Sequence, residues 1–376
     1  MIYLDHNATS PVEPQVLAAM EPFLGEHFGN PSSTHRVGRH AAKAVRQARR
    51  QVADRFGVKS SAVSFASGAT EALNQAILGT ALAAEHARPH LVVTAVEHPA
   101  VLAPCYWLRD TGRASLTVVG VHASGRISLD EVQAAIRPET VLVATMLVNN
   151  ETGVRSATMK IANTARSVHS DLCVLVDAVQ ATARFPFQLS ETGADLLVIS
   201  GHKMGGPQGI GALLCGTEMH TAPTLLRGGN QEQGRRGGTE NVAGIVGLGA
   251  ACELRVDTEE MARLDHRLLA GLREHIDGLT LHGEGAARVP GTLNMRVHGV
   301  EAETLLLHLE LASVMASSGS ACSSGTRDPS HVLKAMGVDP VSIHESVRLS
   351  LGRTTTQDEV DRLIEVLPKI VRELRS

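Results

Sequence analysis

The feature that most constrains the fold is an alternation of short apolar runs with helical patterns between residues 60 and 215. The apolar runs are rich in β-branched residues and too short for helices, so we expect strands. They are Ala62–Ala66, Leu91–Thr94, Leu116–Val119, Val141–Val148, Cys173–Val176, Leu196–Ile199 and Ile210–Leu214. The helical patterns between them include Glu71–Ala84, Leu129–Ile136 and Thr158–His169. This alternation predicts an α/β fold with a large domain, in which helices sandwich a mostly parallel seven-stranded sheet.

The pattern changes towards the C-terminus. Apolar residues recur at helical spacing over Met261–Ile276, and Thr356 with Glu359 forms a capping-box pattern ahead of a last helix. At 376 residues the chain also exceeds the size at which one hydrophobic core usually stops growing. We therefore predict two domains: a large one over residues 14–257, and a smaller α+β domain over 258–376 that residues 1–13 join.

The composition narrows the classes of molecule that this protein could bind. A net charge of −4 gives no global reason to expect a nucleic acid or a membrane surface. The five cysteines are scattered and form no C-x-x-C pair, which argues against a disulfide framework or a metal site. No signal-peptide pattern is visible, and no run approaches 18 apolar residues. We expect a cytoplasmic protein with no metal, no membrane contact and no direct nucleic-acid partner.

One predicted helix, over residues 37–56, carries a basic face. Its cationic residues are Arg39, Lys43, Arg46, Arg49 and Arg50. We interpret this face as solvated; a docking surface for an acidic partner or tRNA is the alternative.

A lysine stands at the end of a predicted strand. Ser200-Gly201-His202-Lys203 directly follows the apolar run that ends at Ile199, and a glycine-rich stretch comes next. This is not a Walker A loop, because the glycines follow the lysine and no Ser or Thr comes directly after it. Lysine forms Schiff bases with carbonyl cofactors. The alternative is a surface lysine in a turn.

Two further motifs suit such a cofactor. Asp177 ends the run Cys173–Val176, and a carboxylate there could keep the pyridinium nitrogen of pyridoxal phosphate (PLP) protonated. Ser67-Gly68-Ala69-Thr70-Glu71 begins a helix, whose backbone N–H groups and Thr70 hydroxyl could bind the phosphate. The alternatives are a helix N-cap for Asp177 and an ordinary helix start.

Together with further blocks, these motifs resemble those of the cysteine desulfurases (NifS/IscS-like), in the class V aminotransferase group of fold-type I PLP enzymes. The blocks are Tyr3–Thr9, Gly29–Ser33, Gly68–Glu71, Glu97-His98, Val148–Gly153, Asp177 with Gln180, Ser200–Lys203, Gly228–Asn241, Ser317–Cys322 and Arg348–Arg353. The resemblance implies a PLP enzyme that converts L-cysteine to L-alanine and passes the sulfur to an enzyme persulfide, for iron–sulfur cluster assembly or thiolation of tRNA or another molecule. A selenocysteine lyase or related PLP lyase is the nearest alternative. A non-catalytic sulfur carrier or scaffold is a more distant one.

The resemblance also implies how the cofactor is held. Lys203 would bind it covalently, Asp177 would pair with the pyridine nitrogen, and Gln180 would bond the phenolic oxygen. His98 would stack on the ring and assist proton transfer. The phosphate-end residues would be Ala69, Thr70, Ser200, His202 and, from the neighbouring subunit of a homodimer, Thr239.

The resemblance assigns the binding of the substrate and the attack on its sulfur to three other residues. Asn150 and Arg348 would hold the substrate carboxylate, and Cys322 would attack the substrate sulfur. The sequence around Cys322 agrees independently, because residues 316–325 are small and polar and unable to pack a core, which predicts an exposed, mobile loop. A sulfur-acceptor protein, such as an iron–sulfur scaffold or a tRNA-thiolation protein, is the expected partner.

The chain departs from the family pattern at three positions. Gly201 stands where the family often has Ala, Thr152 where it often has Ile, and Gln233 where Arg is expected. None of them removes a catalytic group.

Overall fold

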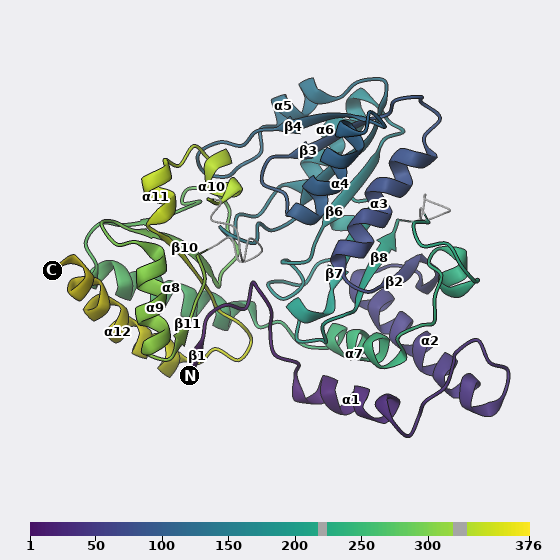
Figure 1. The fold of residues 1–376 in the computed structure, drawn as a ribbon, viewed down its shortest axis with the longest axis horizontal. Helices are drawn as coiled ribbons and strands as arrows, with labels where there is room; N and C mark the ends of the chain where they lie inside the picture. The colour runs from purple at the N-terminus through teal and green to yellow at the C-terminus, as the bar shows by residue number, and fades with distance from the viewer. Residues whose placement is uncertain (217–223, 319–328) are drawn as a thin grey trace.

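The computed structural model describes residues 1–216, 224–318 and 329–376, and its centre is a twisted sheet (Figure 1). Within those ranges the sheet has seven strands in the order β2-β8-β7-β6-β5-β3-β4. They are β2 (Val63–Ala66), β3 (His90–Thr94), β4 (Ser115–Val119), β5 (Thr140–Met146), β6 (Cys173–Asp177), β7 (Leu196–Ser200) and β8 (Gly211–Cys215). Each strand begins and ends within two residues of the corresponding end of its predicted apolar run. Of these strands, β8 runs antiparallel to its neighbours β2 and β7, so the prediction of a mostly parallel sheet is confirmed.

Helices cover both faces of this sheet (Figure 1). Alternate strand residues feed two separate cores: Val92 lies in one, whereas Leu91 and Val93 lie in the other. The first core includes residues of α1 (Pro14–Leu24), α2 (Arg36–Phe56), α5 (Leu129–Ala135), α6 (Thr158–Val168) and α7 (Val242–Cys252). The second includes residues of α3 (Ala69–Ala83) and α4 (Pro99–Asp110). The predicted sandwich of helices around the sheet is therefore present.

Another hydrophobic core lies beside the large sheet. Its elements are α8 (Thr258–His275), α9 (Ala302–Leu311), α12 (Gln357–Arg375), β9 (Leu279–Leu281), β10 (Thr292–Val297) and β12 (Ser346–Ser350). In the described part of the chain the three strands form an antiparallel sheet. The capping box of Thr356 with Glu359 begins α12 as predicted.

The N-terminus joins this second core. β1 (Ile2–Tyr3) pairs in parallel with β11 (Val314–Met315), and Leu4 is buried among the residues of that core. We propose on these grounds that a domain boundary lies between residues 257 and 258, with residues 1–13 belonging to the smaller domain.

Two short helices connect the smaller part to the large sheet. Val332 and Leu333 of α10 (His331–Ala335) and Ile343 of α11 (Pro340–His344) pack in one cluster with Val96, just beyond β3. This packing holds the start of α10 close to the segment that leads from β3 into α4. No helix in the described ranges is long and apolar enough to cross a membrane.

The basic face of α2 is only partly solvated. Arg39, Lys43, Arg46 and Arg50 are exposed, as predicted. Arg49 instead makes a two-pronged pair with Glu232, with N–O distances of 2.6 and 2.7 Å. The Glu232 side chain is only 2% exposed, so this pair joins α2 to the 3-10 helix η4 (Gln231–Gly234) inside the protein.

Candidate active site

A cleft of about 730 Å³ opens at the carboxyl ends of β6 and β7. Ten of the predicted site residues line it: Ala69, Thr70, His98, Asn150, Asp177, Gln180, Ser200, His202, Lys203 and Arg348. Thr239 is exposed and does not line the cleft of its own chain. Cys322 lies outside the described residues. Most of the predicted site is therefore gathered in one cavity from distant segments.

The sheet explains why Asp177 and Lys203 meet. β6 and β7 are parallel neighbours, and Asp177 is the last residue of β6. Lys203 ends the 3-10 turn η3 (Gly201–Lys203), which follows β7 directly. Because the carboxyl ends of parallel strands lie at one edge of a sheet, both side chains reach the same cleft.

Asp177 is a buried carboxyl group at this edge. Its Oδ1 accepts a hydrogen bond from the backbone N–H of Val179 at 2.9 Å. Burial raises its pKa to about 6, although that hydrogen bond and the charge of Lys203 oppose the rise. A carboxylate that is costly to bury is well suited to a cationic N–H partner in the cleft.

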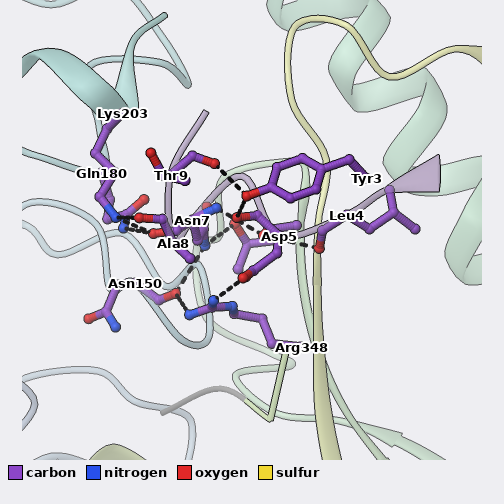
Figure 2. Close-up of polar contacts among 12 residues, drawn as sticks. Tyr3, Leu4, Asp5, Asn7, Ala8, Thr9, Asn150, Gln180, Lys203 and Arg348 are labelled. Atoms are coloured by element: carbon purple, nitrogen blue, oxygen red, sulfur yellow. Dashed lines mark hydrogen bonds and ion pairs between the residues drawn. The ribbon is translucent and has the colours of Figure 1, made fainter. Parts of the chain in front are cut away.

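The N-terminal segment crosses the cleft, which the sequence analysis did not foresee. Figure 2 shows Asn7 and Ala8 reaching Lys203, whose Nζ donates to their carbonyl oxygens at 2.5 and 2.6 Å. Gln180 Nε2 donates to the same Asn7 carbonyl at 3.0 Å. The Tyr3–Thr9 block had been recognised as a motif, but nothing in it indicated these contacts.

Arg348 and Asn150, the two residues predicted to hold the substrate carboxylate, contact each other. Arg348 is buried in β12, and its Nη1 donates to the Asn150 carbonyl oxygen at 3.2 Å. Its Nη2 lies 2.6 Å from the Asp5 carboxylate (Figure 2). The guanidinium is thus oriented by a backbone carbonyl and an acidic side chain, at the end of the cleft away from α3.

His98 is held by the helix that it begins. It is the N-cap of α4, and its Nδ1 accepts a hydrogen bond from the Ala100 backbone N–H at 3.1 Å. Burial, helped by the charges of Lys203 and His331, lowers its pKa to about 4. The ring is therefore neutral at pH 7.

The other end of the cleft carries groups suited to an anion. Thr70 lies in the first turn of α3, where backbone N–H groups have no partner within the helix. Ser200 ends β7, and His202 Nδ1 lies 3.1 Å from Thr9 Oγ1. Burial, and secondarily the charge of Lys203, lowers the pKa of His202 to about 4. A helix N-terminus with hydroxyl and imidazole groups fits a phosphate.

Taken together, the donors and acceptors of the cleft fit PLP. They offer an amine in Lys203, a buried carboxyl group in Asp177 and an anion-binding end at α3. These are the groups that hold the aldehyde, the ring nitrogen and the phosphate of that cofactor.

Two of the departures from the family pattern have local causes. A Cβ atom at Gly201 would lie only 2.9 Å from the Pro207 carbonyl oxygen, so alanine is too large for this turn. Thr152 Oγ1 donates to Asn149 Oδ1 at 3.1 Å, a bond that isoleucine lacks.

Sequence reasoning gave no role to four residues near the cleft. Glu151, Ser330 and His331 line it. Ser330 Oγ donates to Glu151 Oε2 at 2.5 Å, and burial raises the Glu151 pKa. Glu97 lies just behind His98, and burial raises its pKa to about 8. Glu97 and Glu151 stood in recognised blocks, whereas Ser330 and His331 did not.

Comparisons with known proteins agree with this geometry. The family model of the class V aminotransferases matches residues 2–363. A cysteine desulfurase of Trichormus azollae is 44% identical over all of this chain and 94% of its own length. A cysteine desulfurase IscS of Dictyoglomus turgidum is 40% identical over all of this chain and 95% of its own. A solved NifS-like protein superposes with a TM-score of 0.92 at 31% identity, covering 99% of both chains.

Proposed function

This chain belongs to the cysteine desulfurases of the class V aminotransferase family, and from that premise we propose that it converts L-cysteine to L-alanine with PLP bound at Lys203. The sulfur passes to Cys322 as a persulfide. One observation carries the proposal: Lys203, Asp177 and Arg348 come from three separate elements and line a single cleft. An amine, a carboxyl group and a guanidinium are what a PLP enzyme needs to hold its cofactor and an amino acid.

Each group has a defined task in this proposal. PLP, when bound, supplies an electron sink for the amino acid. Lys203 binds the cofactor covalently, and Asp177 holds the proton of its ring nitrogen. Arg348 and Asn150 bind the substrate carboxylate at the opposite end of the cleft. Thr70, Ser200 and His202 bind the phosphate.

Cys322 is the thiol best suited to accept sulfur. The four described cysteines, Cys105, Cys173, Cys215 and Cys252, are all buried. Burial raises their pKa values, to about 12 for Cys105 and Cys252 and about 11 for Cys215, so they resist becoming thiolates.

The transfer of sulfur to Cys322 forms one bond and breaks another. Its sulfur forms an S–S bond with the substrate sulfur as the substrate C–S bond breaks, and the electron pair of that bond stays with the carbon. That carbon takes up a proton in place of the one lost by the Cys322 thiol. The products are L-alanine and the Cys322 persulfide.

The proposed function also includes how the protein assembles and where the sulfur goes. We propose a homodimer in which the exposed Thr239 reaches the phosphate in the neighbouring subunit's cleft. Arg236 of the same segment pairs with Glu71 in the first turn of α3 of its own chain, with 2.8 Å between Nε and Oε1, which anchors the start of this segment. The sulfur then goes to an acceptor protein in the cytoplasm, for iron–sulfur cluster assembly or for thiolation of tRNA.

The change that tests this function most directly is Cys322→Ser. The variant should bind PLP and cysteine normally, whereas alanine production should fall to background, because a serine hydroxyl is a far weaker nucleophile at neutral pH. Mass spectrometry of the wild type after one turnover should find one added sulfur on the Cys322 peptide.

Cys252→Ala is the matched control, since Cys252 is buried in α7 away from the cleft. It should keep full activity with some loss of stability. Near-normal alanine production by Cys322→Ser would refute the persulfide mechanism. Wild-type protein that consumes selenocysteine but not cysteine would refute the choice of substrate.

A further inference from the structure

His331 is a third histidine of the cleft, after His98 and His202, and it has no role in the proposed function. It is the first residue of α10 and is half-buried. Val332 and Leu333, which follow it, pack against Val96, in the segment that connects β3 to α4. The ring is therefore held against the Glu97–His98 segment by hydrophobic packing.

A hydrogen bond fixes which nitrogen of His331 carries a hydrogen. Its Nε2 lies 2.8 Å from the backbone carbonyl oxygen of Glu97. A carbonyl oxygen accepts and never donates, so Nε2 must be the N–H donor. In the neutral ring the lone pair then lies on Nδ1. His331 thus offers a basic nitrogen while its other nitrogen anchors the ring.

His98 has the opposite arrangement. Its Nδ1 accepts from the Ala100 N–H, so the lone pair of the neutral ring is used by the start of α4, and Nε2 carries the hydrogen. Taking up a proton would break this cap. The two rings are thus held by different nitrogens, since His98 Nδ1 accepts from a backbone N–H and His331 Nε2 donates to a backbone carbonyl oxygen.

Charged and titratable groups surround His331. They are Glu151 and Arg348 of the cleft lining, Glu97 and His98 just ahead of α4, and Lys334 three residues further along α10. Glu151 interacts electrostatically with both His331 and Arg348. An amino acid carries its amino group on the carbon next to its carboxylate, so one bound at Arg348 brings that amino group into the cleft that His331 also lines.

We propose that His331 is the catalytic base that removes a proton from the ammonium group of the bound amino acid. An N–H bond of the substrate breaks with its electron pair remaining on nitrogen, and the proton binds Nδ1 of His331. The neutral amine can then react. This inference rests on the proposed function, because it takes an amino acid as the ligand of Arg348.

The decisive variant is His331→Gln. Glutamine keeps an N–H donor for the Glu97 carbonyl but has no basic nitrogen. We expect kcat/KM for cysteine at pH 7 to fall about 100-fold or more, the range of a lost acid–base group. The defect should shrink as pH rises, because solution then supplies the neutral amine. His344→Gln, an exposed change on α11, is the control and should match the wild type.

A second measurement is independent of turnover. In PLP-loaded protein labelled with ¹⁵N-histidine, one ring should keep a protonated Nε2 while its Nδ1 titrates, and His331→Gln should remove that signal alone. A His331→Gln variant with wild-type kcat/KM at pH 7, or with a defect that does not change with pH, would overturn the inference. A wild-type protein that forms no alanine from cysteine would refute the proposed function instead.

Discussion

The two walls of the cleft are built in different ways. The sheet wall consists of Asp177, Ser200, His202 and Lys203, which end two adjacent parallel strands within residues 177–203. The assembled wall consists of Asp5, Asn7, Asn150, His331 and Arg348, whose segments span almost the whole chain. The sheet wall needs only correct pairing of neighbouring strands. The assembled wall exists only when the N-terminus and the smaller core dock on the large sheet.

Their electrostatics differ as well. The sheet wall holds the carboxyl group of Asp177, whose pKa burial raises to about 6. Its ionised form is therefore costly until a cationic group binds beside it. In the assembled wall, the buried Arg348 charge is already paired with Asp5 at 2.6 Å. Removing one member of a buried pair leaves the other unsatisfied. We infer that the sheet wall is adapted to a resident cofactor and the assembled wall to an exchanging substrate.

The largest effect should come from Lys203→Ala in the sheet wall. It removes the amine that holds the cofactor, so borohydride reduction should no longer attach PLP to the protein, and alanine production should fall to background. Mass spectrometry after reduction measures this directly. Lys203→Arg, which keeps the charge but cannot form the Schiff base, should fail equally. Attachment at another lysine in the wild type would remove the sheet wall from cofactor binding.

Asp177→Asn should separate stability from function. Burial raises the Asp177 pKa from 3.8 to about 6, so the folded state binds this proton more tightly than the unfolded state. Cofactor-free protein should therefore lose stability as pH rises from about 4 to about 6, by at most about 3 kcal/mol.

The asparagine variant lacks that loss. At pH 7 its cofactor-free form should be the more stable one in urea unfolding, yet its activity should drop because asparagine cannot hold the pyridinium proton. Equal pH dependence in both proteins would show that Asp177 is not the costly charge of the sheet wall.

Arg348→Ala tests the assembled wall. A charged hydrogen bond contributes about 1.5–3 kcal/mol, so kcat/KM for cysteine should fall about 10- to 150-fold, while PLP remains bound. Arg348→Lys should recover part of the loss, because it restores the charge without the two-pronged geometry. Loss of PLP in the alanine variant would mean that the two walls are not separate in function.

The smallest effect should come from Thr239→Ala. If the neighbouring subunit supplies one neutral phosphate donor, its loss should weaken PLP retention about fivefold, which corresponds to roughly 1 kcal/mol. Thr239→Ser should retain PLP normally, since the hydroxyl remains. PLP dissociation rates on dialysis measure both. A fully active monomer in sedimentation would contradict the shared site.

The sequence predicted the sheet wall better than the assembled wall. Asp177 and Lys203 follow strands whose apolar runs are visible by eye, and parallel pairing then brings them together. Asn150 and Arg348 were named through resemblance alone. The Asp5 pair, the Asn7 and Ala8 carbonyls and His331 were missed, because backbone acceptors and partners far apart in the chain leave no local pattern.

The basic face of α2 gives the same lesson. Helical spacing placed Arg49 among solvated cations, but Glu232 lies within 2.6 Å of it in the folded chain. The periodicity of a helical sequence gives no information about an ion-pair partner 183 residues away.

By itself, then, the sequence determined the strands of the large sheet, their mostly parallel order and the groups that end them, because hydrophobic periodicity and strand-end position are local properties. Tertiary structure alone decided which nitrogen of His98 and of His331 carries a hydrogen, and which acid pairs with Arg348. Those outcomes depend on hydrogen-bond partners and on burial, which exist only once distant segments have packed together.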